Sequence, residues 1–442
     1  MMPTISALLI GTVWLIEVIR VFTPAPTLAA IGLACLGVYA ALALARASRH
    51  IAILFLLVIG AAVGIAAWQH GFPTLLAGFA KAQIFGAFLP SVLLLRATAE
   101  ASPRIQRVRE DLGGLDANGA RSWTQYGSHL LGAVLNVGAV AILAPVVARG
   151  ADTATRLELA RSAARGVGGA VMWSPFFVSI AFISQLVPGV AMWQTMLVGT
   201  GLAILGFILS HALFTPGMRA RDLRLSLARL GPILGPMSIV IGAVVAASLA
   251  LRWSGLQAVA IVVPAMCVAY IAFLGPAKAG GIARRTVASF ARLSDELLIV
   301  VGATILGAVV ASLPAVQQLG AEVTPEMVAG PLLIAALVLV LLVLGQLGLH
   351  PMIGASIVIP VVAAGDFGVC RVALVNAGVF AWALNASVSM WTLPVAVAAS
   401  AFEVPAARMF SRRTFAYLVL HAAGGLLYLA AANATLRALG CT

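Results

Sequence analysis

Charged side chains are scarce in this sequence, and their scarcity excludes most soluble folds. Asp, Glu, Lys and Arg make up 9% of the 442 residues, whereas a soluble domain carries roughly 25%. Hydrophobic residues make up 62%, and the mean hydropathy is +1.08. Apolar runs of about 20 residues, enough to cross about 30 Å of hydrocarbon, recur along the whole chain. The composition therefore predicts an integral membrane protein.

Cysteine is scarce as well. The four cysteines, Cys35, Cys267, Cys370 and Cys441, are scattered without a CxxC spacing or a neighbouring His. They indicate neither a zinc site nor a disulfide framework, and we expect ordinary membrane residues. The net charge of +13 does not point to a nucleic acid, because the basic residues fall in short loops between apolar spans, as the positive-inside rule describes.

Motifs for catalysis or ATP-driven transport are missing. There is no Walker motif, no GxSxG and no HExxH, so we expect neither an enzyme nor catalytic residues, a resident metal or a cofactor. Sodium ions remain a candidate coupling ion. The irregular apolar segments described below contain no carboxylate at their breaks, which argues against a proton antiporter built on an acid pair.

Hydropathy predicts conventional membrane spans over most of the chain, with a polar loop from Thr98 to Gln125. The conventional spans cover residues 4–22, 27–45, 51–69, 74–96, 190–213, 232–252, 255–276, 294–315 and 414–434. Four further segments are long enough to span but are broken by Asn, Gly, Ser or Pro. They cover residues 126–150, 166–188, 330–365 and 372–400.

The irregular segments form two matching pairs. AILAPVVARG, ending at Gly150, matches SIVIPVVAAG, ending at Gly365. MWSPFFVSIAFI, starting at Met172, matches MWTLPVAVAASA, starting at Met390. The two blocks occur in the same order with nearly the same separation, which predicts an internal repeat.

The distribution of positive charge selects how the repeat is threaded. If 126–150 crossed the membrane once, several Arg clusters would lie outside. If it enters and returns as a hairpin, 22 of the 27 Lys and Arg residues face the cytoplasm. These residues lie in the segments 46–49, 96–121, 149–165, 219–229, 278–292 and 408–413. The hairpin threading is therefore preferred, and it makes the second copy enter from the opposite side.

The predicted fold is an all-α integral membrane protein with about eleven transmembrane helices and two re-entrant hairpins in inverted repeats. Its N-terminus is cytoplasmic and its C-terminus lies outside. Four regions follow: scaffold helices at 1–97, a first repeat with an inward-opening hairpin at 126–213, scaffold helices at 232–315, and a second repeat with an outward-opening hairpin at 330–436. We expect a multi-pass protein of the inner (plasma) membrane.

The helix breaks and hairpin tips mark the candidate site. Irregular backbone at membrane depth is tolerated only where it lines a cavity or binds something. Half-helix N-termini suit an anion, and freed carbonyls suit sodium. The candidate substrate- and ion-binding residues are Asn136, Gly138, Ser174, Pro175, Gln346, His350, Pro351, Asn385, Ser387 and Ser389.

Both hairpin-tip candidates have a structural alternative. Asn136 either contacts the ligand or caps a half-helix. His350, an ionisable residue at membrane depth, either handles substrate or protons or caps the hairpin turn through its ring.

The break candidates have alternatives of their own. Ser174 and Pro175 form a binding site or simply kink a helix. Asn385, Ser387 and Ser389 would not share one face of a continuous helix, so they line an unwound stretch or bind neighbouring helices together.

The spacing of the tips resembles a known family. In LNVGAVAILAP, Asn136 stands nine residues before Pro145, and in LHPMIGASIVIP, Pro351 stands nine before Pro360. The chain thereby resembles the ion transporter superfamily, most nearly its divalent anion/sodium symporter family, over nearly its whole length. That family carries Ser-Asn-Thr at each tip, and neither tip here retains it. The resemblance implies an elevator-type homodimer and carries over Asn136 as a tip ligand.

These observations predict a secondary active transporter of a small anion, a carboxylate or oxyanion, coupled to sodium or protons by an elevator mechanism. Its partners would be the anionic substrate, the lipid bilayer and a second copy of the chain. One alternative is a non-transporting membrane subunit or scaffold for a partner protein. Another is a membrane enzyme acting on a lipid-linked substrate, for which His350 stands alone.

Overall fold

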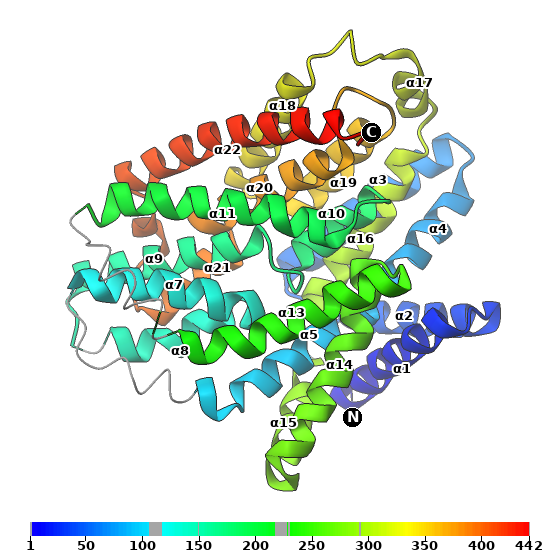
Figure 1. Ribbon diagram of the computed structural model, residues 1–442. Helices are drawn as coiled ribbons and strands as arrows, with labels where there is room; N and C mark the ends of the chain where they lie inside the picture. Colours follow the sequence, from blue (N-terminus) through cyan, green and yellow to red (C-terminus); the bar gives the residue numbers. More distant parts are fainter. Residues whose placement is uncertain are drawn as a thin grey trace. The chain divides into compact units, whose positions relative to one another are not determined.

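The computed structural model describes residues 2–105, 117–148, 150–216, 228, 230–290 and 293–441. Every regular element in these ranges is a helix (Figure 1). Some of the basic residues on which the predicted membrane threading rests lie outside the described residues. They are Arg107, Arg109, Arg149, Arg219, Arg221, Arg224, Arg229 and Arg292.

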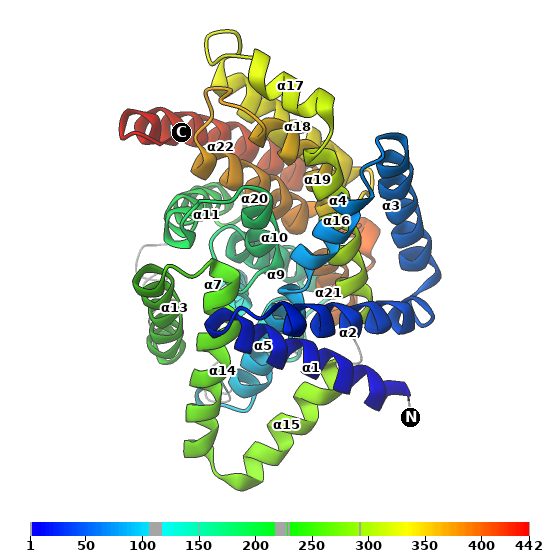
Figure 2. The same ribbon diagram turned by 90° about the vertical axis from the view of Figure 1, so that its right-hand side faces the viewer.

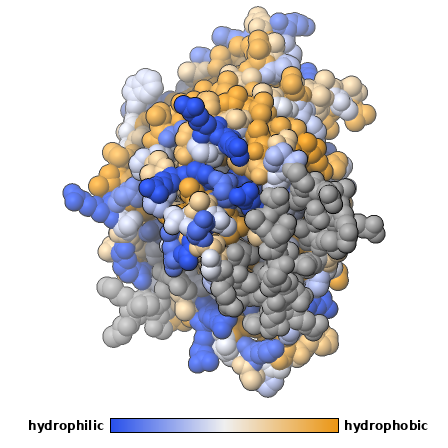
Figure 3. Space-filling view, turned by 90° about the vertical axis from the view of Figure 1, so that its left-hand side faces the viewer, coloured by the Kyte–Doolittle hydropathy of each residue, from blue (hydrophilic) through white to orange (hydrophobic). Residues whose placement is uncertain are grey.

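Ten helices of the described ranges are long and apolar enough to cross a membrane. Large apolar side chains are exposed on them, including Trp68 at 79% and Phe273 at 86%. Figure 3 shows one face of the molecule, on which hydrophobic residues cover broad areas. Soluble proteins rarely expose apolar surface on this scale. The protein is therefore an all-α, multi-pass membrane protein.

The described chain forms two compact units. The first unit comprises Met1–Ala101, Gly242–Thr324 and Met352–Asp366, and the second comprises Ser102–Ile241, Pro325–Pro351 and Phe367–Thr442. The helices of the first unit are α1 (Met2–Phe22), α2 (Pro26–Leu44), α3 (Arg49–Trp68), α4 (Phe72–Ala82), α5 (Phe85–Glu100), α14 (Gly255–Leu274), α15 (Pro276–Phe290), α16 (Ser294–Ala311), α17 (Pro314–Glu322) and α19 (Pro351–Ala363). The helix α13 (Gly231–Leu251) continues from the second unit into the first.

In the first unit, α16 packs against α3 and α4, and α5 packs against α1, α14 and α15 (Figure 2). The contact between α4 and α16 requires a glycine, because a Cβ on Gly78 would lie 2.8 Å from Ile305 Cα. The predicted span 74–96 differs from the structure, in which the helix is interrupted between Ala82 and Phe85. Helix α15 occupies a stretch predicted as a basic loop.

The second unit contains the first irregular pair and most of the second, whose residues 352–365 belong to the first unit. Its helices are α7 (Ala117–Leu135), α8 (Gly138–Val147), α9 (Thr153–Val171), α10 (Val178–Leu186), α11 (Met192–Phe214), α18 (Gly330–Gln346), α20 (Arg371–Val388), α21 (Leu393–Ala401), the 3-10 turn η1 (Ala406–Met409) and α22 (Arg412–Ala438). Helix α20 lies at its centre, packed against α9, α11, α18 and α22. In an 18-residue window of the stretch Arg371–Ala401, 94% of the residues are buried.

Two helices of the second unit extend into segments that the sequence analysis assigned to polar loops. Helix α7 begins at Ala117, within the predicted loop Thr98–Gln125. Helix α9 begins at Thr153, where the Asp152 side chain caps it by accepting a hydrogen bond from Thr155 N at 2.8 Å. Because the first half of α9 is polar, the broken segment 166–188 is not among the ten candidate spans.

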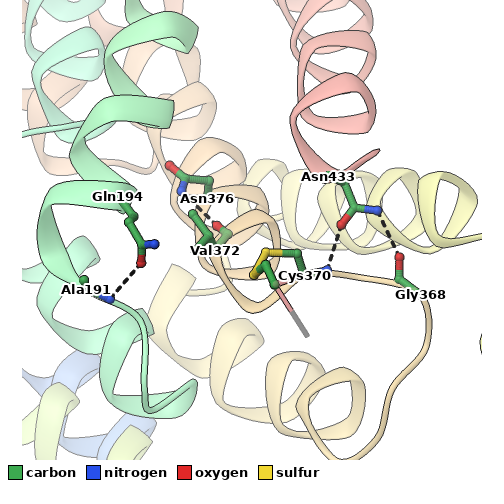
Figure 4. Close-up of a disulfide and its surroundings, with 8 residues drawn as sticks. Ala191, Gln194, Gly368, Cys370, Val372, Asn376 and Asn433 are labelled. Atoms are coloured by element: carbon green, nitrogen blue, oxygen red, sulfur yellow. Dashed lines mark hydrogen bonds between the residues drawn. A yellow bond between two sulfur atoms is a disulfide. The ribbon is translucent and has the colours of Figure 1, made fainter. Parts of the chain in front are cut away.

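The prediction that no cysteine forms a disulfide is wrong. Cys370 and Cys441 form one, with their Cα atoms 5.5 Å apart, while Cys35 and Cys267 are free. The bond joins the start of α20 to the end of α22 (Figure 4). Beside it, Asn433 Oδ1 accepts from Cys370 N at 2.7 Å and Asn433 Nδ2 donates to Gly368 O at 2.9 Å. Spacing could not reveal a pairing between cysteines 71 residues apart.

Candidate functional site

Two helices of the second unit are interrupted midway, and both interruptions have a local cause. Between α9 and α10 the chain is non-helical from Met172 to Phe177, where Pro175 has no N–H to donate and its ring would clash with the preceding turn. Between α20 and α21 it is non-helical from Ser389 to Thr392, and α21 opens with a proline in its first turn. Each pair of helices therefore forms one broken helix.

The two broken helices run antiparallel to one another. Three contacts align them, namely Arg156 with Glu403, Gly168 with Ser387, and Pro188 with Arg371. Along this series the residue number rises in α9–α10 while it falls in α20–α21. In addition, α10 packs against α20, and α21 packs against α9. The shorter half of each broken helix thus lies beside the longer half of the other.

The crossing point is unusually close. A Cβ on Gly168 would lie 1.8 Å from Ser387 Oγ and 2.9 Å from Ala383 O, so only glycine fits. Ser387 is oriented there by donating to Ala383 O at 2.8 Å. The first interruption begins at Met172 and the second at Ser389. At 1.5 Å per residue they flank the crossing on opposite sides, about 9 Å apart along the helix axis.

The first interruption is held against the first predicted hairpin. Ser174 is fully buried, and its Oγ donates to Ala133 O of α7 at 2.6 Å while accepting from Phe176 N at 3.3 Å. Pro175 is buried beside it. Ala133 lies three residues before Asn136, so the structure brings Ser174 close to the first tip.

The first tip is a tight turn between α7 and α8, which pack against each other. Asn136 adopts a φ of +56°, a left-handed conformation that Asn tolerates better than most residues. Its Oδ1 accepts from Val137 N at 2.8 Å. Among the hydrogen bonds of the described residues, none uses the side-chain nitrogen Nδ2 of Asn136. The half-buried tip, followed by buried Gly138, therefore offers two N–H groups.

The second interruption is held against α18 by the side-chain amide of Asn385, whose two N–H groups are both used. Asn385 is 1% exposed, and its Oδ1 accepts from Gln346 Nε2 at 2.8 Å. Its Nδ2 donates to Leu341 O and Ala381 O, each at 3.2 Å. Buried Ser389 donates to Gly345 O at 3.2 Å. Asn385 and Ser389 therefore bind the second interruption to α18, and their contact with a ligand stays a prediction.

The remaining candidates lie at the second tip. The ring of half-buried His350 is edge-on to Trp382, with 6.1 Å between the ring centres. Pro351 is the first residue of α19. The candidates thus form two groups, one around Asn136 and Ser174 and one around Asn385 and Ser389. The contact between Gly168 and Ser387 lies between these groups.

The sequence analysis missed His129, which braces the first interruption from α7. Trp173 Nε1 donates to His129 Nε2 at 3.0 Å, so this nitrogen is an acceptor. His129 Nδ1 then carries the proton and donates to Gly166 O at 3.3 Å. The ring is neutral in this arrangement. Its position within the apolar segment 126–150 was the available signal.

Arg165 was also missed, because it was counted among the basic residues of a cytoplasmic loop. It lies instead in the middle of α9 with 2% of its surface exposed. Hydropathy cannot separate a buried arginine from one in a loop, since both lower the local average equally.

No protein-family model matches the chain, and no curated protein matches its sequence. The relationship to the divalent anion/sodium symporters stays a prediction. Within the described ranges no group of three His, Cys, Asp or Glu residues is placed to hold a metal ion. The chemistry that the arrangement offers is that of amide donors, hydroxyls and the carbonyl and N–H groups freed at two helix breaks.

Proposed function

We propose that the protein is a secondary active transporter of a small anion, a carboxylate or oxyanion, which binds between the two interruptions and is coupled to sodium or protons. The observation that carries this proposal is the antiparallel pair of broken helices, crossing at Gly168 and Ser387. Broken helices freed of backbone hydrogen bonds near the middle of a membrane protein are characteristic of transport sites.

An anionic cargo is favoured by the donors at these breaks. The half-helices α10 and α21 begin at Val178 and Leu393, and neither has a side chain capping its first turn. Their N–H groups and partial positive charges attract anions. Asn136 adds an amide with two N–H groups. The freed carbonyls on the other side of each break are ligands of the kind that sodium requires.

The disulfide supports the proposed orientation in the inner membrane. Disulfides persist in oxidising compartments and are rare in the cytosol. The threading by positive charge places residues 365–371 and the C-terminus outside, and the bond joins Cys370 and Cys441 in these two segments. Two independent features, arginine distribution and cysteine pairing, therefore favour the same side.

An elevator mechanism is favoured by the division into two units. The second unit contains both broken helices and the first hairpin, and the first unit contains most of the predicted scaffold helices. We propose that the second unit carries the cargo and that the first unit anchors a homodimer. The hairpins would be re-entrant and would open alternately to the two sides.

The first test is thermal unfolding of the purified protein with mono-, di- and tricarboxylates and oxyanions, with and without sodium, since a ligand of the folded state raises its stability. The informative variant is Asn136→Gly, because glycine keeps the left-handed turn and removes the amide. We expect one anion class to raise the unfolding temperature of the wild type in a sodium- or pH-dependent manner, and Asn136→Gly to lose about tenfold in affinity.

Uptake into proteoliposomes then separates transport from binding. We expect the stabilising anion to accumulate under an inward sodium or proton gradient and not without one. If no anion of the panel moves under either gradient, the proposal is wrong, and a non-transporting membrane subunit becomes the better explanation.

A further inference from the structure

Arg165 is a buried, charged side chain of the second unit whose direct contacts are with neutral groups. Its Nε donates to Ser210 Oγ at 3.1 Å and its Nη2 to Ser162 Oγ at 3.0 Å. Its guanidinium carbon lies 3.8 Å from the centre of the Phe214 ring. Ser210 is itself oriented by donating to Gln125 Oε1 at 2.8 Å. These partners fix the guanidinium in place but none of them neutralises its charge.

Three buried polar atoms, one of Arg165 and two of residues in α7, have no hydrogen-bond partner within the described part of the chain. They are Nη1 of Arg165, Nε of Arg121 and Oγ of Ser128. Ser128 lies against the next residue of α9, since a Cβ on Gly166 would be 2.9 Å from Ser128 Cβ. Arg121, Gln125 and Ser128 are spaced to share one face of α7, the helix that packs against α9. Buried polar atoms are rarely left unpaired, so a cluster of them indicates a missing partner.

Among the described residues, the formal charges in this cluster do not balance. Arg121, Arg161 and Glu158 act on Arg165 electrostatically. Glu158 is already engaged by Arg161, with 2.5 Å between Oε1 and Nη1. Over the ranges that the structure describes, the ion pairs include neither Arg121 nor Arg165. An unpaired charge in a low-dielectric interior is unfavourable unless an opposite charge accompanies it.

We propose that Arg165, Arg121 and Ser128 form a binding site for a small oxyanion group, a phosphate or carboxylate, between α7 and α9. The guanidinium fork suits two oxygens of such a group, and the Ser128 hydroxyl supplies a further donor. The site uses no residue of the helix breaks and does not rest on the transport proposal. Its occupant is either a soluble anion or the phosphate of an acidic lipid headgroup, which present the same oxygens.

The test uses the full chain, stripped of lipid in a neutral detergent. Inorganic phosphate is titrated at constant ionic strength while thermal unfolding is followed. A parallel arm without phosphate compares nanodiscs of phosphatidylcholine with nanodiscs that also contain phosphatidylglycerol. We expect a saturable rise in unfolding temperature in at least one arm. A rise with phosphate identifies a soluble anion, and a rise only with phosphatidylglycerol identifies a lipid headgroup.

The variants separate binding from folding. Ser128→Ala breaks no hydrogen bond of the described chain and should weaken the response about tenfold. Arg165→Gln should weaken it about a hundredfold. Arg156→Gln is the matched control on the same helix, since Arg156 pairs with Glu403 outside the cluster. This control should respond like the wild type.

The proposal is overturned if the wild type shows no saturable response in either arm. It is also overturned if Ser128→Ala and Arg165→Gln respond as the wild type does. Should Arg165→Gln fail to fold, Ser128→Ala and Arg121→Gln decide between the outcomes. The atoms that these two variants remove, Ser128 Oγ and Arg121 Nε, have no hydrogen-bond partner in the described chain.

Discussion

The two broken helices are built from similar sequences but are held in different ways. The first is held by Ser174 to the hairpin of α7 and α8. The side-chain nitrogen Nδ2 of the neighbouring Asn136 is unused within the described residues. The second is held to α18 by Asn385, whose amide makes three hydrogen bonds. Both arms of the first hairpin also belong to one unit, whereas α18 and α19 belong to different units.

This difference indicates that the two broken helices have different roles. A buried amide whose two N–H groups are both bonded inside the protein fixes a helix, and it has no N–H left to offer an anion. A half-buried amide with unused N–H groups, such as that of Asn136, can donate them to a ligand. We therefore expect ligand recognition at the first repeat and structural restraint at the second. The following four predictions test this contrast, beginning with the largest expected effect.

Removing the disulfide tests the restraint of the second repeat. Closing a loop of 71 residues stabilises a folded chain by about 2–4 kcal/mol. Cys370→Ser with Cys441→Ser should lower the free energy of unfolding by that amount, and reductant should do the same to the wild type. Thermal unfolding with and without reductant measures both effects. Cys35→Ala, at a free cysteine, should leave the reductant response intact, and equal stability of the double variant would contradict the prediction.

Widening the crossing tests the contact between the repeats. Gly168→Val should cost about 3 kcal/mol, because its side chain would overlap Ser387 and the backbone of α20. Gly242→Ala, in a helix where a Cβ meets nothing within 4 Å, should instead be neutral or stabilising by about 0.5–1 kcal/mol. Denaturation of the purified variants measures the difference, and a tolerated Gly168→Val would contradict the close crossing.

Replacing the two asparagines tests the contrast most directly. Asn385→Ala should cost about 2 kcal/mol, since it leaves Gln346 and two backbone carbonyls without their partner. Asn136→Gly should change stability by only about 0.5 kcal/mol. Paired measurements of unfolding and anion affinity are required. Equal stability losses in both variants, with equal affinities, would remove the distinction between a restraining and a recognising repeat.

The smallest effect concerns the N-terminal caps of α9 and α20, the first halves of the two broken helices. Asp152 caps α9, and hydrogen bonding to Thr155 lowers the pKa of its carboxyl below the ordinary 3.8. A lowered pKa stabilises the fold above the unfolded pKa, and this contribution is lost as pH falls through the folded value. Asp152→Asn should therefore show a flatter loss of stability below about pH 4. Helix α20, whose N-cap residue is Cys370, has no side-chain cap. An unchanged pH profile in the variant would contradict this account.

The sequence predicted the local features of the site well. Pro175, the Asn136 turn and the polar stretch after Val388 all interrupt helices through their own backbone preferences, so a local pattern reveals them. The apolar spans followed from composition for the same reason. Helix α9 was harder, because its first half is polar and is recognisable only through its cap at Asp152.

Features that depend on distant residues could not be predicted. The pairing of Cys370 with Cys441 has no signature in spacing. The burial of Arg165 depends on Ser210 and Phe214 in another helix. Likewise the hydrogen bond between Asn385 and Gln346 depends on the packing of α18 against α20. In each case the sequence supplied the residue, and tertiary packing assigned its partner.

The bond between Cys370 and Cys441 also makes a closed covalent ring from residue 370 to residue 441. A single protease cut anywhere in that ring, for example in the stretch around Pro405 between α21 and α22, opens the ring without releasing a fragment. The second broken helix would thus stay attached to α22 after such a cut. The two pieces of the chain would separate on a gel only once a reducing agent is added.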